Sequence, residues 1–346
     1  MSRAEARDLH VHPLTISDLG EQALIARVRA RTPSSPDWVL TGIGDDAAVL
    51  QPARGMVDVV TTDSLVEDVH FRRTWSTSRD IGHRALAVNL SDLASMGATP
   101  RAVLLSLAMP ALLPLDEFDG LIDGFLALAA QEGAPLVGGN LTRSPGPLVI
   151  DVTAIGAARP RRILRRSGAR AGDLLFVTGR LGAAAAGLAL RRAGAEMARM
   201  DADQRACVLR YDRPDARLRT GVIVANNRAA SACMDVSDGL ADAARQIAEA
   251  SGCGVELNTD AIPIHPGARA SASVHGKDAL SLAWSGGEDY ELLFAVPRRR
   301  TRLFLAAIRQ AGEVEATEIG ICTKNRDVCA IAGGARSPLP DGFQHF

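Results

Sequence analysis

Aspartates in polar or glycine-rich turns recur along the chain and are the residues best suited to chemistry. They lie in GIGDDAAVL (42–50), TTDS (61–64), NLSD (89–92), MDVSDG (234–239) and SGGED (285–289). Burying an unpaired carboxylate is costly, so acids beside apolar segments need a cation or several hydrogen-bond donors. Mg²⁺ prefers one or two carboxylates, completed by water and by the phosphates of a substrate. The set therefore predicts a site for a metal-bound nucleotide.

Each of these acids also has a local explanation. Asp45, Ser64, Asp238 and Asp289 all fit as helix caps or turn residues, and one at a time that explanation is the better one. Their repetition at the ends of predicted elements favours the metal site for the set as a whole.

The stretch from Gly42 to Ala47 fits the loose dinucleotide pattern G-x-G-x-x-A, follows a plausible strand at 38–40, and has Asp63 downstream. However, the chain then runs into Pro52 and leaves no room for a phosphate-binding helix, and Asp45 and Asp46 would repel a pyrophosphate. A dinucleotide-binding domain is therefore disfavoured. The chain also lacks the G-x-x-x-x-G-K-[ST] pattern of a P-loop.

Composition limits the remaining classes. A chain of 346 residues is too long for one ordinary core and predicts two domains. The net charge of -1 gives no general attraction to nucleic acids or anionic membranes, so we expect neither as a partner. Five widely spaced cysteines without a CxxC pair predict neither a disulfide framework nor a zinc site. With no signal-peptide pattern or membrane-length apolar run, the expected location is the cytoplasm.

Periodicity predicts mixed elements in both halves. Helices are expected at 17–31 (capped by Ser17), 78–96, 115–132, 181–193, a charged stretch to about 226, 239–251 and 302–310. Strands are expected at 56–62, 102–109, 148–155, 173–178, 232–236, 255–257 and 290–296, with two short ones before the tail. A basic run at 159–170 reads as a linker. The prediction is two α+β domains, residues 1–158 and 159–346.

In their order, the motifs resemble those of the thiamine-monophosphate kinase family, within the aminoimidazole ribonucleotide synthetase-like superfamily. The resemblance spans nearly the whole chain through GIGDDAAVL, TTDSLVEDVHF, ALAVNLSDLASMGATP, GGN, RRSGARAGD, MDVSDGL, SGGEDYEL and DGFQHF. It implies ATP-dependent phosphorylation of thiamine monophosphate to thiamine diphosphate by a homodimer. It also implies an N-terminal α+β domain that contributes strands to a barrel at the dimer interface, and a C-terminal α/β domain that completes the substrate site.

Individual residues inherit roles from this resemblance. Those similar to ligands of several Mg²⁺ ions are Asp46, Thr61, Thr62, Asp63, Asp92 and Asp235, with Asp238 near another ion. Those similar to thiamine phosphate contacts are His70, Glu288 and Phe343. Those similar to ATP contacts are Gly139, Arg166 and Ser237, and Asn140 is assigned to both the nucleotide site and the metal site.

Two positions depart from the family pattern. The family's GGD reads Gly138-Gly139-Asn140 here, so one expected metal ligand has lost its charge, and a tyrosine expected near the adenine is Glu132. Asn140 is either a neutral ligand or a cap of the Gly-Gly turn, and a neighbour such as Asp151 is a candidate for the missing charge. These departures leave the metal stoichiometry and the nucleotide affinity open.

The sequence shows no Ser-His-Asp spacing and no activated cysteine, which favours direct in-line transfer over a covalent intermediate. A phosphate oxygen is already anionic at neutral pH, so as an acceptor it needs no strong general base. Catalysis would consist of aligning the two polyanionic substrates, ATP and the phosphate acceptor, and neutralising their charge with Mg²⁺.

The alternatives are another member of the same superfamily that acts on a different acceptor, a metal-dependent phosphohydrolase, and a non-catalytic nucleotide sensor. Residues 179–187 fit either a phosphate-binding turn or close helix packing.

Overall fold

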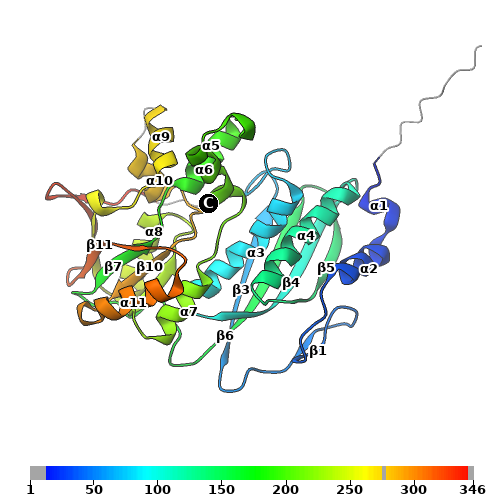
Figure 1. The fold of residues 1–346 in the computed structure, drawn as a ribbon, viewed down its shortest axis with the longest axis horizontal. Coiled ribbons are helices and arrows are strands. Elements are labelled where there is room, and N and C mark those ends of the chain that lie inside the picture. Colours follow the sequence, from blue (N-terminus) through cyan, green and yellow to red (C-terminus); the bar gives the residue numbers. More distant parts are fainter. Residues whose placement is uncertain (1–12, 275–277, 342–346) are drawn as a thin grey trace, which may run out of the picture.

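The computed structural model describes residues 13–274 and 278–341, which form two sheet-centred domains side by side (Figure 1). Phe343 lies outside the described residues.

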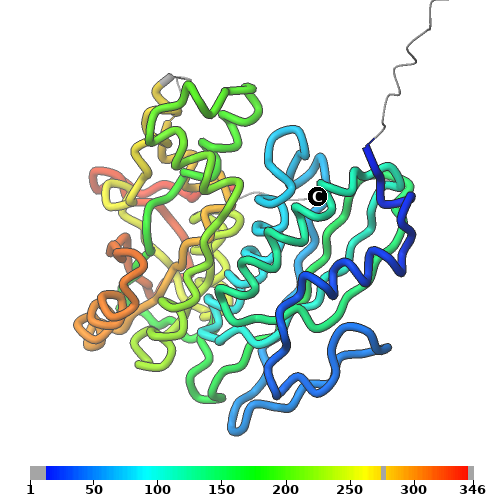
Figure 2. The backbone as a smooth tube through the Cα atoms, turned by 45° about the vertical axis from the view of Figure 1, so that its right-hand side comes forward, coloured from blue at the N-terminus to red at the C-terminus, as the bar shows by residue number. Residues whose placement is uncertain are grey.

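The N-terminal domain is built on a four-stranded sheet in the order β3-β6-β4-β5, in which β4 and β5 are parallel and the other neighbours antiparallel. Helices α3 and α4 lie together on one face of this sheet, as Figure 1 and Figure 2 both show. The elements in chain order are α1 (Ile16–Leu19), α2 (Glu21–Arg31), β1 (Val39–Thr41), β2 (Val49–Leu50), β3 (Val57–Val66), α3 (Ser78–Ser95), β4 (Thr99–Pro110), α4 (Leu115–Gln131), β5 (Leu136–Ser144) and β6 (Val149–Ala158).

Glycines let α3 and α4 approach each other closely. A Cβ at Gly82 would lie 2.0 Å from the carbonyl oxygen of Leu121, and one at Gly124 would lie 1.9 Å from that of Arg79. A larger residue at either position would therefore push the helices apart. Thr77 caps α3, because its side-chain oxygen accepts a 3.2 Å hydrogen bond from the Asp80 amide.

Alternation along β3 separates two chemical environments. Successive side chains of a strand point to opposite faces, so Thr61, Asp63 and buried Leu65 face the helices, while Thr62 and Ser64 face outward. In the antiparallel register Ser64 pairs with Asp151 of β6, which shares the outward face. The two faces carry different candidate residues.

The C-terminal domain has a seven-stranded sheet in the order β13-β12-β9-β11-β7-β10-β8. Its elements are β7 (Leu174–Thr178), α5 (Ala183–Arg192), η1 (Met197–Arg199), α6 (Ala202–Asp212), α7 (Leu218–Asn226), β8 (Ala232–Asp235), α8 (Leu240–Ser251), β9 (Gly254–Asn258), η2 (Thr259–Ala261), α9 (Pro266–Val274), α10 (Ala279–Ser285), β10 (Leu292–Val296), η3 (Arg298–Arg300), α11 (Thr301–Ala311), β11 (Ala316–Thr323), β12 (Val328–Ala332) and β13 (Ala335–Pro338). Strands β7 and β10 are buried along their whole length, because helices cover both faces there.

The predicted two-domain α+β fold with mixed sheets is confirmed, but the C-terminal domain differs from a strict α/β arrangement. Among the strands of this sheet that the structure describes, β12 and β9 form the only parallel pair. The reason lies in the connections, since consecutive strands here do not repeat a strand–helix–strand crossover unit.

Two helix predictions are corrected. The helix expected at 17–31 is broken at Gly20, whose φ of 77° ends α1 and precedes α2. Thr15, not Ser17, is the N-cap of α1, and the Ser17 hydroxyl instead donates to the carbonyl of Ala111 at 2.6 Å. The charged stretch to about 226 is also interrupted, by the segment that contains Pro214 between α6 and α7.

None of the helices within residues 13–274 and 278–341 is both long and apolar enough to cross a membrane.

Candidate active site

Four polar residues from three elements meet where the two domains adjoin. Thr61 and Asp63 come from β3, Asp92 from α3, and Asp235 from the end of β8. The Thr61 hydroxyl bonds to the Asp92 carboxylate. Ser91, one residue before Asp92, donates from its hydroxyl to Asp235 at 2.8 Å. The structure thus brings together acids that lie 172 positions apart in the chain (63 to 235).

These carboxylates lack sufficient positive charge around them. Burial raises the pKa of Asp63 to about 7, and the nearby Asp92, Asp151 and Asp238 carboxylates add to the effect. Burial also raises the pKa of Asp235 to about 7, with Asp92 contributing and Arg166 opposing. The pKa of Asp92 is raised for the same reason, although the Thr61 hydroxyl and Arg166 oppose it. The raised pKa values show that these carboxylates have too little positive charge nearby, and a bound divalent cation would supply it.

The same acids do not form a complete metal cage. In the described part of the chain, no group of three or more His, Cys, Asp or Glu side chains is placed to hold one ion. Mg²⁺ keeps several waters and commonly takes substrate phosphates as ligands. The donor set therefore fits ions that arrive with a polyphosphate better than a permanently caged structural ion.

Thr62 and Asn140 lie on the outward face of the sheet, away from this cluster. The Thr62 hydroxyl is 3.1 Å from Asp151 Oδ1 and donates to the Val152 carbonyl at 3.0 Å. Asn140 is exposed in the middle of β5, in register with Ser106 of β4, which is itself in register with Asp151. Asn140 is therefore part of a strand and does not cap a Gly-Gly turn.

Asp46 is also separated from the cluster. It is exposed in the loop between β1 and β2, where a Cβ at Gly42 would lie 3.9 Å from the carbonyl of Val137 at the start of β5. Strand β5 forms one edge of the sheet and β3 the other, so three strand spacings of roughly 4.8 Å lie between them. The loop that carries Asp46 thus starts beside the β5 edge of the sheet, whereas Asp63 lies on the β3 edge. The loop also leads straight into β2 without a helix, as expected for a sequence that only imitates the dinucleotide pattern.

The two described residues assigned to the acceptor lie in constrained loops. His70 Nδ1 accepts a 3.0 Å hydrogen bond from the Val66 amide, so a neutral His70 ring carries its proton on Nε2. Glu288 has a φ of 61°, and its amide donates to the Ser237 carbonyl at 2.6 Å. A positive φ is costly for glutamate and persists only where the surroundings impose it.

The residues after Glu288 supply part of that constraint. The buried carboxylate of Asp289 accepts hydrogen bonds from the amides of Gly182 (2.6 Å) and Ala184 (3.1 Å) at the start of α5. These amides are thus occupied by a side chain of the protein itself. For residues 179–187, this arrangement favours packing over a phosphate-binding turn.

The remaining nucleotide candidates occupy three places. Gly139 lies in β5, where a Cβ would be 1.9 Å from the carbonyl oxygen of Leu105, so only glycine fits. Ser237 belongs to the loop after β8, next to Glu288. Arg166 is exposed and bonds to the Gln246 side chain, yet it is close enough to lower the pKa of Asp92 and Asp235. Glu132 ends α4 and lines a separate hollow of about 260 Å³.

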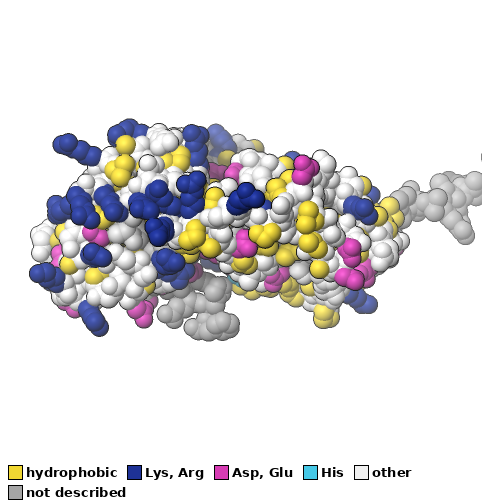
Figure 3. All heavy atoms as spheres, turned by 90° about the horizontal axis from the view of Figure 1, so that it is seen from below, with side chains coloured by type: hydrophobic (Ala, Val, Ile, Leu, Met, Phe, Trp, Pro, Cys, Tyr) yellow, Lys and Arg dark blue, Asp and Glu magenta, His cyan; other side chains and the backbone are white. Residues whose placement is uncertain are grey.

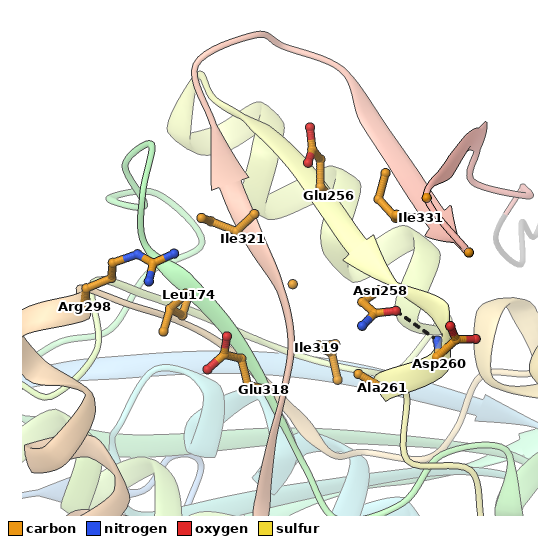
Figure 4. Close-up of a pocket in the computed structure, with 13 residues that line it drawn as sticks. Leu174, Glu256, Asn258, Asp260, Ala261, Arg298, Glu318, Ile319, Ile321 and Ile331 are labelled. Carbon is orange, nitrogen blue, oxygen red and sulfur yellow. Dashed lines mark hydrogen bonds between the residues drawn. The ribbon is translucent and has the colours of Figure 1, made fainter.

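A hollow of about 500 Å³ elsewhere on the C-terminal domain is not this site. Figure 4 shows it on the face of β9, β11 and β12, where Glu256, Asp260, Glu318 and Arg298 surround apolar residues such as Ile321. It contains none of the candidate residues, and no lining side chain comes from the N-terminal domain.

Two buried residues beside the acceptor candidates were not predicted from the sequence. Arg84 of α3 is 2% exposed and pairs with Glu288, and Tyr211 of α6 donates from its hydroxyl to the His70 carbonyl at 3.0 Å. The available signal was an arginine between Ile81 and Ala85, inside the apolar face of a predicted helix.

The comparisons with known proteins agree in family. Residues 44–158 match the model described as AIR synthase related protein, N-terminal domain, and residues 170–331 match the one for the C-terminal domain. The thiamine-monophosphate kinase of Salmonella typhimurium is 39% identical over 298 residues, covering 85% of this chain and 87% of that protein. The thiamine-monophosphate kinase structure from Stenotrophomonas maltophilia K279a has a TM-score of 0.80 and 38% identity, covering 95% of this chain and 100% of the other. A structure described as AaThiL complexed with AMPPCP and TMP has a TM-score of 0.75 and 31% identity, covering 96% and 99%.

Proposed function

The chain belongs to the thiamine-monophosphate kinase family, and from this premise we propose that it phosphorylates thiamine monophosphate to thiamine diphosphate with ATP. A phosphate oxygen of the acceptor attacks the γ-phosphorus of ATP, the bond from that phosphorus to the β,γ-bridging oxygen breaks, and ADP leaves. The observation that carries the proposal is the under-neutralised cluster of Asp63, Asp92 and Asp235 between the domains, because two polyanions meet only where cations gather.

Mg²⁺ is part of this proposal. Thr61, Asp63, Asp92 and Asp235 would hold it, with Asp238 near a further ion. When bound, the metal supplies positive charge for the phosphates of both substrates. The chain itself contributes orientation: the Thr61 hydroxyl fixes the Asp92 carboxylate, and the Ser91 hydroxyl fixes that of Asp235. His70 would contact the acceptor through its ring, and the hydrogen bond from the Val66 amide to Nδ1 fixes the orientation of that ring.

The contact between Cys207 and His265 supports direct transfer over a route through a covalent cysteine intermediate. Cys207 Sγ lies 3.5 Å from His265 Nδ1, but burial raises the pKa of Cys207 to about 12. His265 Nδ1 also accepts the Gly267 amide at 3.1 Å. A thiol held in its neutral form this way is a poor nucleophile at physiological pH.

We also propose a homodimer formed through the N-terminal domains, with the outward sheet faces making a barrel. Exposed apolar side chains support this, namely Leu40, Val49, Val57 and Val60 around β1 to β3. Figure 3 shows apolar surface gathered on the N-terminal domain, whereas Lys and Arg gather on the C-terminal one. A second copy would also give a role to Asp46, Thr62 and Asn140, which one chain leaves away from the cluster.

The proposal keeps the domain boundary between residues 158 and 159, where β6 ends and the segment leading to β7 begins. It also assigns the reaction to the cytoplasm, where ATP is available.

The test is to mix the protein with ATP, Mg²⁺ and thiamine monophosphate and to measure thiamine diphosphate and ADP. We expect both products in equal amounts, and none after chelation of the metal. Phosphate release from ATP without the acceptor would instead indicate a phosphohydrolase. Folded protein that binds Mg–ATP but forms no product would support the alternative of a non-catalytic nucleotide sensor. The neutral Asn140, at a position that the family pattern fills with aspartate, is the feature of the sequence that favours this alternative.

A further inference from the structure

Arg84 is a buried cation in the middle of α3. Its guanidinium pairs with the Glu288 carboxylate, donates from one NH group to the Tyr211 carbonyl at 3.1 Å, and lies 4.3 Å from the centre of the Tyr211 ring. Removing a guanidinium from water costs several kcal/mol unless such partners replace its hydration. The residue thus joins α3 of the N-terminal domain to two segments of the C-terminal domain.

Tyr211 extends this connection to a second loop. Its side chain is 2% exposed, and its hydroxyl donates to the carbonyl oxygen of His70 at 3.0 Å. His70 in turn accepts the Val66 amide on Nδ1. A continuous series of contacts therefore runs from Glu288 through Arg84 and Tyr211 to His70.

The geometry of Glu288 shows why such support matters. Gly287, Glu288 and Tyr290 have φ values of 67°, 61° and 49°, so the segment is held in a sparsely populated conformation. Asp289 is fixed by the amides at the start of α5, and Glu291 is fixed by Arg217 and Thr178. Glu288 differs because its partner belongs to the N-terminal domain.

We propose that Arg84, together with Tyr211, is a positioning residue that holds Glu288 and His70 at a fixed separation for the acceptor. This inference rests on the proposed function and on the family resemblance, which assigns both Glu288 and His70 to the binding of thiamine monophosphate. Arginine is required because its planar group makes the ion pair, the carbonyl bond and the ring contact at once, which a lysine ammonium does not. Acceptor recognition should then depend on Arg84 although Arg84 itself does not touch the acceptor.

Two variants and a control test the proposal. Arg84→Lys keeps the charge but not the fork, Tyr211→Phe removes only the hydroxyl, and Arg27→Gln breaks a different inter-helix ion pair, with Asp119. For Arg84→Lys we expect the KM and the calorimetric Kd for thiamine monophosphate to rise about tenfold or more, as for loss of charge-assisted hydrogen bonds. For Tyr211→Phe we expect a rise of about threefold to tenfold. The KM for ATP should stay within about twofold in all three proteins.

Hydrogen exchange gives a readout that does not depend on activity. Peptides covering residues 66–71 should exchange faster in Arg84→Lys and Tyr211→Phe than in wild type or Arg27→Gln, because the His70 carbonyl loses its support. Unchanged exchange, or equal rises in KM for ATP and acceptor, would overturn the positioning role. Wild type that forms no thiamine diphosphate would overturn the proposed function, while the exchange data would still decide whether the network exists.

Discussion

The carboxylate of Glu291 and the carboxylates of the Asp63, Asp92 and Asp235 cluster differ in how much positive charge the protein places around them. Glu291 is fully buried, but Arg217, Arg210 and Thr178 surround it; burial alone would raise its pKa, and these partners hold the pKa below the usual value. Asp235 is also buried and Asp63 is half-buried, yet their pKa values are raised to about 7. Burial is common to both groups, and the supply of positive charge is what differs.

This contrast separates acids that are paired within the fold from acids that lack sufficient counter-charge within it. Glu291 has its cations built into the chain, so its cost of burial is met within the fold. Asp63, Asp92 and Asp235 repel one another, and exposed Arg166 offsets only part of that repulsion. In the proposed function only the second group would bind metal ions, although both groups occur in the sequence as acids in similar motifs.

The largest effect is expected at the internally paired acid. Glu291→Gln should lower the free energy of unfolding by about 3–5 kcal/mol, because it removes the carboxylate that is paired with the buried Arg217 guanidinium. Urea unfolding of the metal-free protein measures this. The matched control is Glu256→Gln, which removes a carboxylate from the exposed pair with Arg336 and should cost less than about 1 kcal/mol. Equal losses in both variants would remove the distinction between the two groups.

The opposite result is expected for the cluster. Asp63→Asn should lower turnover by at least about 100-fold, as expected when a metal site that stabilises transition-state charge is weakened. The metal-free variant should be as stable as wild type or more so, because one of several repelling carboxylates is gone. Asp58→Asn, at an exposed position of the same strand, is the control for activity. Near-normal turnover in Asp63→Asn would reduce the cluster to local caps and turns.

Much of the fold could be predicted from periodicity. Helices α3 and α4 were expected at 78–96 and 115–132 and end within one residue of those bounds, because long apolar faces leave little ambiguity. Strand β5 was missed, since its Gly138-Gly139-Asn140 segment lacks the β-branched residues typical of strands. The reason for Gly139 is the close approach of the Leu105 carbonyl, which only the folded sheet reveals.

The site was only partly predictable, because some of its contacts form only when distant segments of the chain come together in the folded protein. Buried-strand and helix patterns indicated that acids such as Asp92 and Asp235 need partners, and the structure places these two together. Adjacent Thr61 and Thr62, however, face opposite sides of the sheet, and a motif comparison treats them alike. The pairing of Arg84 with Glu288 joins residues 204 positions apart, beyond the reach of any local pattern.

A smaller effect is expected at Asp289, whose charge is only partly compensated. Burial raises its pKa to about 7 despite two bonds from backbone amides, against 3.8 for the unperturbed group. Between these values the folded protein keeps a proton that the unfolded chain has lost, so stability falls as the pH rises. The unfolding free energy of the wild type should decrease between about pH 5 and pH 8, and in Asp289→Asn this decrease should be smaller by about 2 kcal/mol. Asp63 and Asp235 titrate in both proteins, so the difference between the two curves isolates Asp289. Parallel curves would show that Asp289 is already ionised in the folded protein at pH 5.

The smallest effect concerns Asn140, where a neutral side chain stands at a position that the family pattern fills with aspartate. One added negative charge near an ion is worth a few kcal/mol at an effective dielectric of about 20, before dehydration is subtracted. Because Asn140 is exposed on β5, we expect Asn140→Asp to lower the half-saturating Mg²⁺ concentration only about tenfold. Asp151 is the other candidate to supply the missing negative charge, but it lies two strands away from Asn140 and is bonded to the hydroxyls of Thr62 and Ser64.

Titration of activity with Mg²⁺ decides between these explanations. Thr142→Asp adds the same charge at an exposed position two residues along β5, on the same face, and controls for a general electrostatic effect. A shift in Asn140→Asp that Thr142→Asp does not reproduce would place position 140 next to an ion. Since Asn140 and Asp63 lie on opposite faces of the sheet within one chain, such a shift would also favour a site completed by a second copy. Overlapping curves for wild type and Asn140→Asp would mean that position 140 does not contact the metal, and would leave the inward-facing acids as its protein ligands.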